Sequence, residues 1–523
     1  MRYFICIVIL VLFLSCEEKV KDNRPNILFI MSDDHAYQAI SAYSSDLTKT
    51  PNIDRIASEG IRFTNACVTN SICAPSRAVI LTGKHSHLNG KIDNQVPFDT
   101  TQVTFPQILQ NAGYQTAMFG KLHFGNNPKG FDQFRILDDQ GSYYAPDFFT
   151  AHEGKINVTG YTTDLITDMT IDWLEKDRDD TKPFLLMYLH KAPHREWFPA
   201  PRHQAEYTSK TFKEPETLFD QFDNRGTAAR TAEMNLVKHM NYAGDSKIYP
   251  EVMDELGISE YMKWDKSAFL KEYNRMTDAE RESWDKHYGP INERFKKEYP
   301  NMDETSLMHW RYQRYMQDYL GCIAAVDEGV GRVLDYLEEN KLDENTIVVY
   351  TSDQGFYLGE HGWFDKRFAY NESFKTPLLI KWPNVIKSGI TNTQMVQNLD
   401  FAQTFLEAAG ITPPEDMQGE SLLPLFKGQS EGFRDAVYYH YYEYPSIHMV
   451  KRHYAIVTEG YKLIHFYNDV DEWELYDREK DPNEIHNVFD DPAYEDVVKN
   501  MKKRLIEIQK YYKDFEGLKY SEQ

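Results

Sequence analysis

The stretch Asn26-Ile-Leu-Phe-Ile-Met-Ser-Asp-Asp34 is a continuous apolar run that ends in polar residues. Runs of similar length at 184–189 and 346–350 end in the same way. Such runs are typical of strands buried on both faces, which occur in parallel sheets. The sequence therefore predicts an α/β fold with a large doubly wound sheet, mixed or parallel, flanked by helices. The helical patterns between the runs lie at 51–60, 104–112 and 164–175.

Polar side chains follow all three runs at the point where each strand ends. Asp33-Asp34 follows the first run, His190 the second and Asp353-Gln354 the third. In doubly wound sheets, ligands bind beyond the carboxyl ends of the strands. The functional site is therefore predicted at this edge of the sheet.

The pairs Asp33-Asp34 and Asp353-Gln354 are candidate metal ligands. Adjacent buried carboxylates repel each other unless a cation or a proton compensates them. A set of oxygen ligands favours Ca²⁺, or with less preference Mg²⁺, over Zn²⁺. Asp33-Asp34 alone would be better explained by a helix cap or a solvated turn, but the second pair at an equivalent strand end favours a metal site.

The chain of 523 residues is divided into segments of different composition. Residues 203–312 are charged, aromatic and helical in character, and we interpret them as a helical insertion in a catalytic domain that spans 25–430. Residues 431–523 are rich in tyrosine and are predicted to form a smaller C-terminal subdomain of antiparallel strands followed by a helix. The predicted strands are 436–442, 453–457 and 461–466, and the predicted helix is 494–512.

The N-terminus has the features of an export signal. Arg2 precedes an apolar run that is too short to cross a bilayer as a stable helix, and we predict a signal peptide at 1–15. Leu14-Ser15-Cys16 resembles a bacterial lipobox, in which cleavage leaves Cys16 as a lipidated N-terminus before a polar tether at 16–24. We therefore expect an exported protein that is anchored through Cys16 to the outer membrane or cell surface, or is periplasmic. An ordinary signal peptide with an incidental cysteine is the alternative.

Charge and cysteine content limit the possible partners. The net charge of −23 argues against nucleic acid, whose phosphates would be repelled. An anionic substrate would have to meet a local positive patch. Beyond the export signal, Cys67, Cys73 and Cys322 form an odd set that does not resemble a disulfide framework. We interpret one of them as functional and two as packing residues.

Cys73-Ala-Pro-Ser-Arg77 resembles the signature of type I sulfatases, which belong to the alkaline-phosphatase-like superfamily. The resemblance implies that a maturation enzyme oxidises Cys73 to formylglycine (3-oxoalanine). One oxygen of the hydrated aldehyde then attacks sulfur, and the second hydroxyl later expels the sulfate. Taken alone, the pentapeptide is equally compatible with a small buried cysteine in a turn. If Cys73 opens a helix, Arg77 returns to the same face, where it would offset the carboxylates.

The segment Gly113-Tyr-Gln-Thr-Ala-Met-Phe-Gly-Lys-Leu-His-Phe-Gly125 resembles the second sulfatase signature. The resemblance implies that Lys121 and His123 hydrogen-bond the diol and the sulfate. Ala192-Pro193-His194 resembles the Pro-His element of the family, whose histidine protonates the departing alcohol oxygen. His190 is the competing candidate for this general acid.

Lys366 lies eleven residues before Pro377, a spacing that resembles that of the sulfate-binding lysine of the family. Its neighbours Asp365 and Arg367 should then border the substrate. His453 and the tyrosine-rich segment 438–445 offer further sugar contacts, although cross-strand pairing explains most of these tyrosines equally well.

The resemblance also implies one Ca²⁺ per chain. The family more often has Asn or His at the position of Gln354, which keeps the carbonyl oxygen but adds a methylene. The implied ligands are Asp33, Asp34, oxidised Cys73, Asp353 and Gln354.

Together the motifs resemble a sulfatase that hydrolyses sulfate esters of a polysaccharide or its oligosaccharides. They are most similar to bacterial enzymes that act on algal polysaccharides, such as ulvan or carrageenan, or on 6-sulfated N-acetylglucosamine in glycosaminoglycans. A phosphate or phosphonate monoester hydrolase of the same superfamily is the alternative enzyme. A non-catalytic glycan-binding lipoprotein is an alternative of another class, which the complete set of catalytic residues disfavours. The expected partners are the sulfated glycan and the maturation enzyme, and the membrane only through a lipid anchor.

Overall fold

A ten-stranded sheet forms the centre of the protein, whose computed structural model describes residues 22–522. The strand order is β11-β2-β10-β9-β1-β8-β4-β5-β6-β7. β1 pairs in parallel with β8 and β9, whereas β10 runs antiparallel to β9, so the sheet is mixed. The strands are β1 (Asn26–Ser32), β2 (Ile61–Phe63), β4 (Gln115–Gly120), β5 (Gln133–Leu137), β6 (Asp147–Thr150), β7 (Gly154–Asn157), β8 (Phe184–Leu189), β9 (Thr346–Ser352), β10 (Leu378–Lys381) and β11 (Ile390–Asn392).

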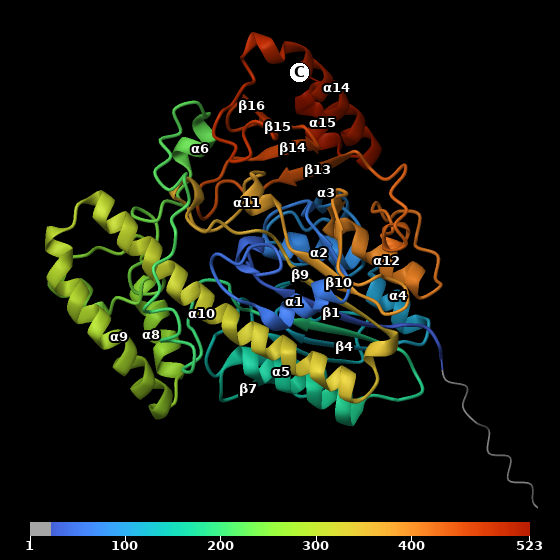
Figure 1. Cartoon of the computed structure of the whole chain (residues 1–523), viewed down its shortest axis with the longest axis horizontal. Coiled ribbons are helices and arrows are strands. Elements are labelled where there is room, and N and C mark those ends of the chain that lie inside the picture. The colour runs from blue at the N-terminus through green and yellow to red at the C-terminus, as the bar shows by residue number, and fades with distance from the viewer. Residues whose placement is uncertain (1–21, 523) are drawn as a thin grey trace, which may run out of the picture.

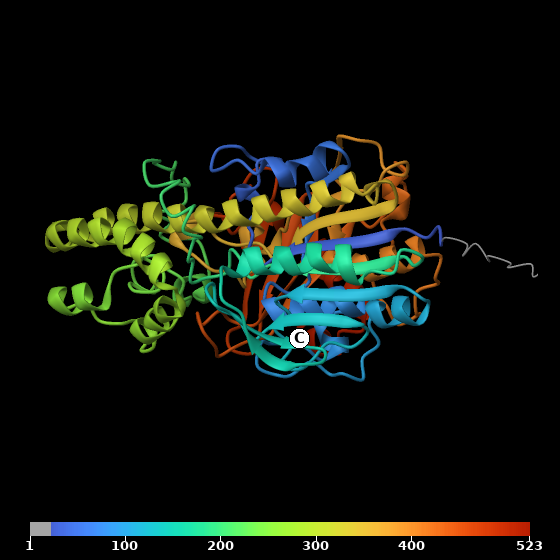
Figure 2. The ribbon, with the colours of Figure 1, turned by 90° about the horizontal axis from the view of Figure 1, so that it is seen from below.

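The central strands are buried on both faces, which explains their continuous apolar sequence. Along β1, Leu28 and Ile30 belong to one core, and Ile27, Phe29 and Met31 belong to another. Helices cover both faces of the sheet (Figures 1 and 2), which confirms the predicted doubly wound α/β fold. The first core is covered by α1 (Pro51–Ser58), α5 (Thr162–Asp172) and α10 (Glu304–Glu339), and the second by α2 (Cys73–Thr82), α4 (Phe105–Asn111) and α12 (Phe401–Ala408).

The register of the central strands determines where the site lies. Ser32 lies opposite Ser352, and these are the last residues of β1 and β9. The following residues, Asp33 and Asp353, therefore emerge together at one edge of the sheet. The neighbouring β8 ends beside them at Leu189. The polar residues after all three strands thus face one region.

The predicted insertion, residues 203–312, is helical and contains no strand. Figure 1 shows α8 and α9, with the beginning of α10, projecting to one side of the sheet. The ring of Trp284 in α9 stacks on Phe198 at a centroid distance of 4.9 Å, so the insertion shares a core with the main domain. Its other helices are α6 (Thr227–Thr231), α7 (Pro250–Leu256), α8 (Asp265–Arg275) and α9 (Asp278–Glu298).

The C-terminal part forms a four-stranded antiparallel sheet in sequential order, as predicted for a smaller subdomain. One face packs on the terminal helices and the other on the catalytic domain. The strand β16 was not predicted from the sequence. The elements are β13 (Ala436–Tyr441), β14 (His453–Thr458), β15 (Tyr461–Phe466), β16 (Glu472–Asp477), α14 (Glu495–Tyr512) and α15 (Phe515–Ser521). Shorter elements of the catalytic domain are β3 (Ala66–Cys67), α3 (Ser86–Asn89), α11 (Asn371–Phe374), β12 (Val396–Gln397) and α13 (Leu423–Phe426).

The predicted signal peptide and Cys16 lie outside the described residues, and the domain boundaries stay predictions. At the end of the predicted tether, Arg24 donates a hydrogen bond of 2.9 Å to the Ala112 carbonyl. Across residues 22–522, no helix has the length and apolar content needed to cross a lipid bilayer.

Candidate active site

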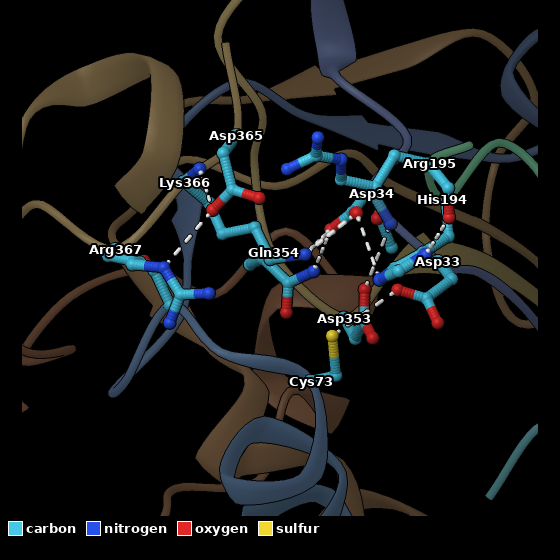
Figure 3. Close-up of polar contacts among 12 residues, drawn as sticks. Asp33, Asp34, Cys73, His194, Arg195, Asp353, Gln354, Asp365, Lys366 and Arg367 are labelled. Atoms are coloured by element: carbon cyan, nitrogen blue, oxygen red, sulfur yellow. Dashed lines mark hydrogen bonds and ion pairs between the residues drawn. The ribbon is translucent and has the colours of Figure 1, made fainter. Parts of the chain in front are cut away.

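Cys73 is the first residue of α2, a helix whose ten residues are all buried. The preceding Ile72 is extended, so the chain turns into the helix at Cys73 itself. The Cys73 side chain, 1% exposed, points toward the carboxylates at the end of the sheet (Figure 3), with Sγ 3.5 Å from Asp33 Oδ1. The structure thus brings the predicted nucleophile position and the predicted metal ligands together.

Arg77 lies one helical turn after Cys73 and faces the same cluster. Its Nη2 is 2.8 Å from Asp353 Oδ2 and 3.3 Å from Asp33 Oδ2. A buried guanidinium that contacts two carboxylates fixes both of them in place and compensates part of their charge.

Three carboxylates meet at the ends of β1 and β9. Asp33, Asp34 and Asp353 are fully buried, and one oxygen from each lies within 4.8 Å of the others. Lys121 forms an ion pair with Asp33, and Lys366 Nζ is 2.6 Å from Asp34 Oδ1. The cluster is therefore compensated by cations from different parts of the chain.

The two adjacent aspartates of this cluster differ in pKa. Burial opposes ionisation, yet Lys121 and the neighbouring cations hold the pKa of Asp33 well below its usual range. Burial raises the pKa of Asp34, with a further contribution from Asp33. Burial and Asp33 also raise the pKa of the Cys73 thiol. Without a bound cation, a thiolate is therefore disfavoured at this position.

The residues at this edge fit a hard divalent cation. Gln354 Nε2 donates a hydrogen bond of 2.5 Å to Asp34 Oδ1, whereas its Oε1 is buried without a hydrogen-bond partner in the part of the chain that the structure describes. A buried carbonyl oxygen needs a donor or a cation. Three carboxylates and this amide oxygen form the type of ligand set that Ca²⁺ or Mg²⁺ prefers. A second close group joins Asp33 with Cys73 and His194, where the predicted nucleophile and general acid meet.

Lys121 and His123 follow the end of β4, and both contact Gln140. Lys121 Nζ donates a hydrogen bond of 2.5 Å to Gln140 Oε1, and Gln140 Nε2 lies 3.1 Å from His123 Nε2. His123 Nε2 also lies 3.2 Å from Asp139 Oδ1. Gln140 therefore links the two residues of the second signature, and no sequence pattern had indicated it.

The segment that contains Lys366 has an unusual backbone. Asp365 and Arg367 both have positive φ, at 75° and 103°, which is rare for residues with a side chain. Arg367 Nη1 forms a 2.6 Å ion pair with Glu443, and Asp365 Oδ2 lies 3.3 Å from His448 Nε2. This conformation directs three consecutive charged side chains toward the site (Figure 3).

The structure separates the two candidate general acids. His194 lies at the site, where its Nε2 is 3.8 Å from Asp34 Oδ2 and its Nδ1 contacts the Arg195 carbonyl. His190 is fully buried beside Tyr188, with ring centroids 4.3 Å apart, and neither ring nitrogen has a hydrogen-bond partner among residues 22–522. His194 is therefore placed to reach a substrate, and His190 is not.

His453 does not reach the site, so the expected sugar contact has to be corrected. It is fully buried; its Nε2 accepts a hydrogen bond from the Ala369 N–H and its Nδ1 lies 2.8 Å from the Lys451 carbonyl oxygen. Burial lowers its pKa to about 3, so the ring is neutral. Aromatic rings surround it, including Phe466 at 5.0 Å. His453 therefore joins β14 to the catalytic domain, and the nearby His448 contacts the site instead.

A pocket of about 320 Å³ leads to Cys73. It contains five of the predicted site residues: Cys73, His194, Asp365, Lys366 and Arg367. Sequence reasoning missed the rest of its wall. Lys191 and Arg195 flank the recognised Pro-His element, whereas the other residues follow no motif. The further lining residues are Asn94, Gln140, Gly141, Tyr143, Lys191, Arg195, Glu196, Trp264, Glu272, Ile447 and His448.

The fold and the site together define a hydrolase. Its predicted nucleophile is the first residue of a buried helix, next to a carboxylate cluster at the end of an α/β sheet. The sulfatase family model matches residues 25–411, and the model described as N-sulphoglucosamine sulphohydrolase, C-terminal, matches residues 359–511. The chain therefore belongs to the sulfatase family and is a sulfuric ester hydrolase, as its motifs predict. Sulfatases generally use a formylglycine and a divalent metal ion, and the aspartate-rich site described above is suited to bind one.

Several known proteins are similar to this chain over most of its length. The N-acetylglucosamine-6-O-sulfatase of Bacteroides thetaiotaomicron is 48% identical over 95% of this chain and 88% of its own length. The ulvan-active sulfatase of Formosa agariphila is 24% identical over 96% of this chain and 85% of its own length. A solved structure of an enzyme in complex with its substrate D-glucosamine-2-N,6-O-disulfate is also 48% identical, with a TM-score of 0.89, and the match covers 94% of this chain and 99% of that one.

Proposed function

We propose that this sulfatase removes the 6-O-sulfate of a glucosamine residue in a sulfated glycan or its oligosaccharides. The observation that carries the proposal is the pocket of about 320 Å³ with Cys73 at its inner end, a size that suits one sulfated sugar rather than an uninterrupted polymer. The 48% identity to an N-acetylglucosamine-6-O-sulfatase supports this choice of sugar over the ulvan and carrageenan alternatives.

The cations around Cys73 would hold the sulfate group. Lys121 pairs with Asp33 and Lys366 pairs with Asp34, so both ammonium groups lie at the carboxylate cluster and can contact sulfate oxygens beside position 73. Fixed cations aimed at these oxygens stabilise the charge that develops during sulfuryl transfer. Formylglycine at position 73 would supply the oxygen nucleophile, and a Ca²⁺ held by the three aspartates and Gln354 would supply further positive charge.

His194 is placed to act as the general acid. Its Nδ1 contacts the Arg195 carbonyl, which leaves Nε2 directed toward the site. A proton on Nε2 can then be given to the departing sugar oxygen, because a sugar alkoxide is a poor leaving group. Burial and Lys121 lower the pKa of His194. The negative charge of a bound sulfate would raise this pKa again and so favour the protonated form of the histidine.

Export and lipidation form part of the proposal. The apolar run before Leu14-Ser15-Cys16 supports an exported lipoprotein that meets its glycan outside the cytoplasm. Incorporation of labelled fatty acid into the wild-type chain but not into Cys16→Ser tests the anchor. Equal labelling of the two proteins would contradict it.

A comparison of defined esters tests the reaction. The oxidised protein should desulfate N-acetylglucosamine 6-sulfate faster than the 3- or 4-sulfated isomers. With one chromogenic alcohol, it should hydrolyse the sulfate ester faster than the phosphate ester. Faster turnover of the phosphate would favour the phosphate or phosphonate hydrolase alternative. Sugar binding without any turnover by the oxidised protein would favour the glycan-binding alternative.

A further inference from the structure

Four cationic side chains line the pocket, and one differs from the rest. Three of them contact a carboxylate, so their charge is already compensated. The fourth, Lys191, has no such partner among residues 22–522. The compensated cations and their partners are Lys366 with Asp34, Arg367 with Glu443 and Arg195 with Asp245.

Lys191 is buried but still faces the pocket. It is 4% exposed, and within the described part of the chain its Nζ has no hydrogen bond or ion pair. Nζ lies over the ring of Tyr143, 4.8 Å from the ring centroid. A cation–π contact is weaker compensation than a carboxylate. A buried ammonium without a counter-ion is unfavourable unless a ligand supplies one.

Glu272 is the acid that raises the pKa of Lys191 most, but it is hydrogen-bonded to another residue. Glu272 lines the same pocket, but its Oε2 accepts a hydrogen bond of 3.0 Å from the Tyr143 N–H. Burial and Lys121 lower the pKa of Lys191, while Glu272, Asp33 and Glu196, the last of which also lines the pocket, oppose this change only in part. The local charge balance therefore favours an additional anion near Nζ.

The position of Lys191 indicates which part of a substrate it would meet. The His194 N–H donates a hydrogen bond of 3.0 Å to the Lys191 carbonyl, so both residues belong to one turn. Tyr143 Oη donates a hydrogen bond of 2.5 Å to the His194 carbonyl, which holds the same wall together. Because His194 would face the departing alcohol, Lys191 lies on the sugar side of the reacting sulfate.

We propose that Lys191 binds a second anionic group of the substrate, carried by the sugar part and distinct from the sulfate ester that is hydrolysed. The inference rests on the proposed function, since it assumes that His194 marks the leaving-group side. Two groups share this chemistry: a sulfamate on the glucosamine itself, or the carboxylate of an adjoining uronic acid.

Matched substrates test the proposal. Glucosamine N,6-disulfate and N-acetylglucosamine 6-sulfate differ by one anion on the same ring, and a disaccharide with a free or methyl-esterified uronate differs by one anion on the next ring. In Lys191→Met, the ratio of kcat/KM for the more anionic to the less anionic member of one pair should fall at least tenfold. Lys191→Arg should keep most of the ratio. The pair that responds identifies the sulfamate or the carboxylate.

The control is Lys176→Met, which removes an exposed lysine from the π-helical turn Trp173–Asp177 that follows α5. Its ratios should equal those of the wild-type protein. If Lys191→Met lowers kcat/KM equally for both members of each pair, the second-anion assignment is wrong, because the lysine then acts on the reacting sulfate or on folding. The assignment is also wrong if Lys191→Met changes neither kcat/KM value in either pair.

A binding measurement separates this proposal from the proposed function. With Cys73→Ser, calorimetry should detect N-sulfoglucosamine lacking the 6-sulfate, or the uronate disaccharide lacking it, and Lys191→Met in the same background should weaken that binding at least tenfold. Such a result would support the anion-binding role of Lys191 even if the wild-type protein failed to remove the 6-sulfate of glucosamine. Identical binding with and without Lys191 would overturn the proposal even if desulfation succeeded.

Discussion

The floor of the pocket and its rim are built in different ways. The floor is Cys73, with Arg77 and the carboxylates after β1 and β9 packed beneath it; it is buried, and its residues lie at the start of α2 or directly after strands whose register is fixed. The rim includes Trp264 and Ile447, which are 44% and 49% exposed and come from irregular segments of the insertion and the C-terminal part. This difference indicates that the floor determines the reaction and the rim determines which sulfate ester reaches it.

The largest effect should follow from a change at the floor. Cys73→Ala removes the residue that we propose becomes the nucleophile, so turnover should fall by at least about 10⁴-fold. Cys67→Ala removes another buried cysteine, which lies in β3 and does not line the pocket, and should keep turnover. Desulfation assays on both variants provide the measurement. An active Cys73→Ala protein would show that the floor does not supply the nucleophile.

His194 connects floor and rim, and its replacement should be the next most damaging. His194→Ala should reduce turnover of a sugar sulfate by roughly 10³-fold, because it removes the proton donor. A nitrophenyl sulfate needs little protonation, so the loss there should be under about tenfold. His190→Ala serves as the matched control and should show no such dependence on the leaving group. Equal losses with both leaving groups would rule out the acid role.

Metal binding at the floor is expected to have a somewhat smaller effect that can be measured apart from activity. Asp353→Asn removes one carboxylate from the cluster and should lower divalent metal affinity and turnover by about 100-fold. Metal content by mass spectrometry after dialysis, and recovery on adding Ca²⁺, provide two readouts. Asp132→Asn, next to β5 and outside the pocket, should leave metal content unchanged. Full metal retention in Asp353→Asn would contradict the ligand assignment.

At the rim, a several-fold effect on substrate binding is expected. Trp264→Ala should raise KM for an oligosaccharide by about three- to tenfold through lost ring contact, with kcat nearly constant. Phe219 is also 44% exposed but does not line this pocket, so Phe219→Ala is a matched control. If both variants behave alike, the rim does not contribute to substrate selection.

The smallest effect on turnover is expected away from both regions. Asp514 accepts a 2.6 Å hydrogen bond from Tyr438 Oη and contacts His440, and although burial opposes ionisation, His440 lowers its pKa. A lowered pKa stabilises the fold above the unfolded pKa near ~4, and that contribution is lost as the pH falls below it. Asp514→Asn should therefore cost about 1–3 kcal/mol at pH 7, and its melting temperature should approach that of the wild type toward pH 3. A pH-independent difference would contradict this assignment.

The sequence predicted the fold and the floor because both depend on local patterns. Apolar runs identified the three central strands, and the residues after them had to meet at one edge. The rim depends on where irregular segments lie, so Trp264 and Gln140 carried no recognisable signal. His453 shows the limit of strand patterns: alternation indicates that its side chain leaves one face of the sheet, but not whether that face meets a pocket or another core. Here it meets a core.

The burial of α2 has a consequence for biosynthesis. Cys73 is 1% exposed at the inner end of a pocket that admits a sugar but not another protein. If Cys73 is oxidised to formylglycine as proposed, the oxidising enzyme would have to act on a chain in which α2 has not yet packed. Oxidation and folding would then compete in time, and molecules that fold first would stay inactive although their structure is complete. The yield of active enzyme would thus be set by kinetics, and a variant that folds more slowly would be more completely matured.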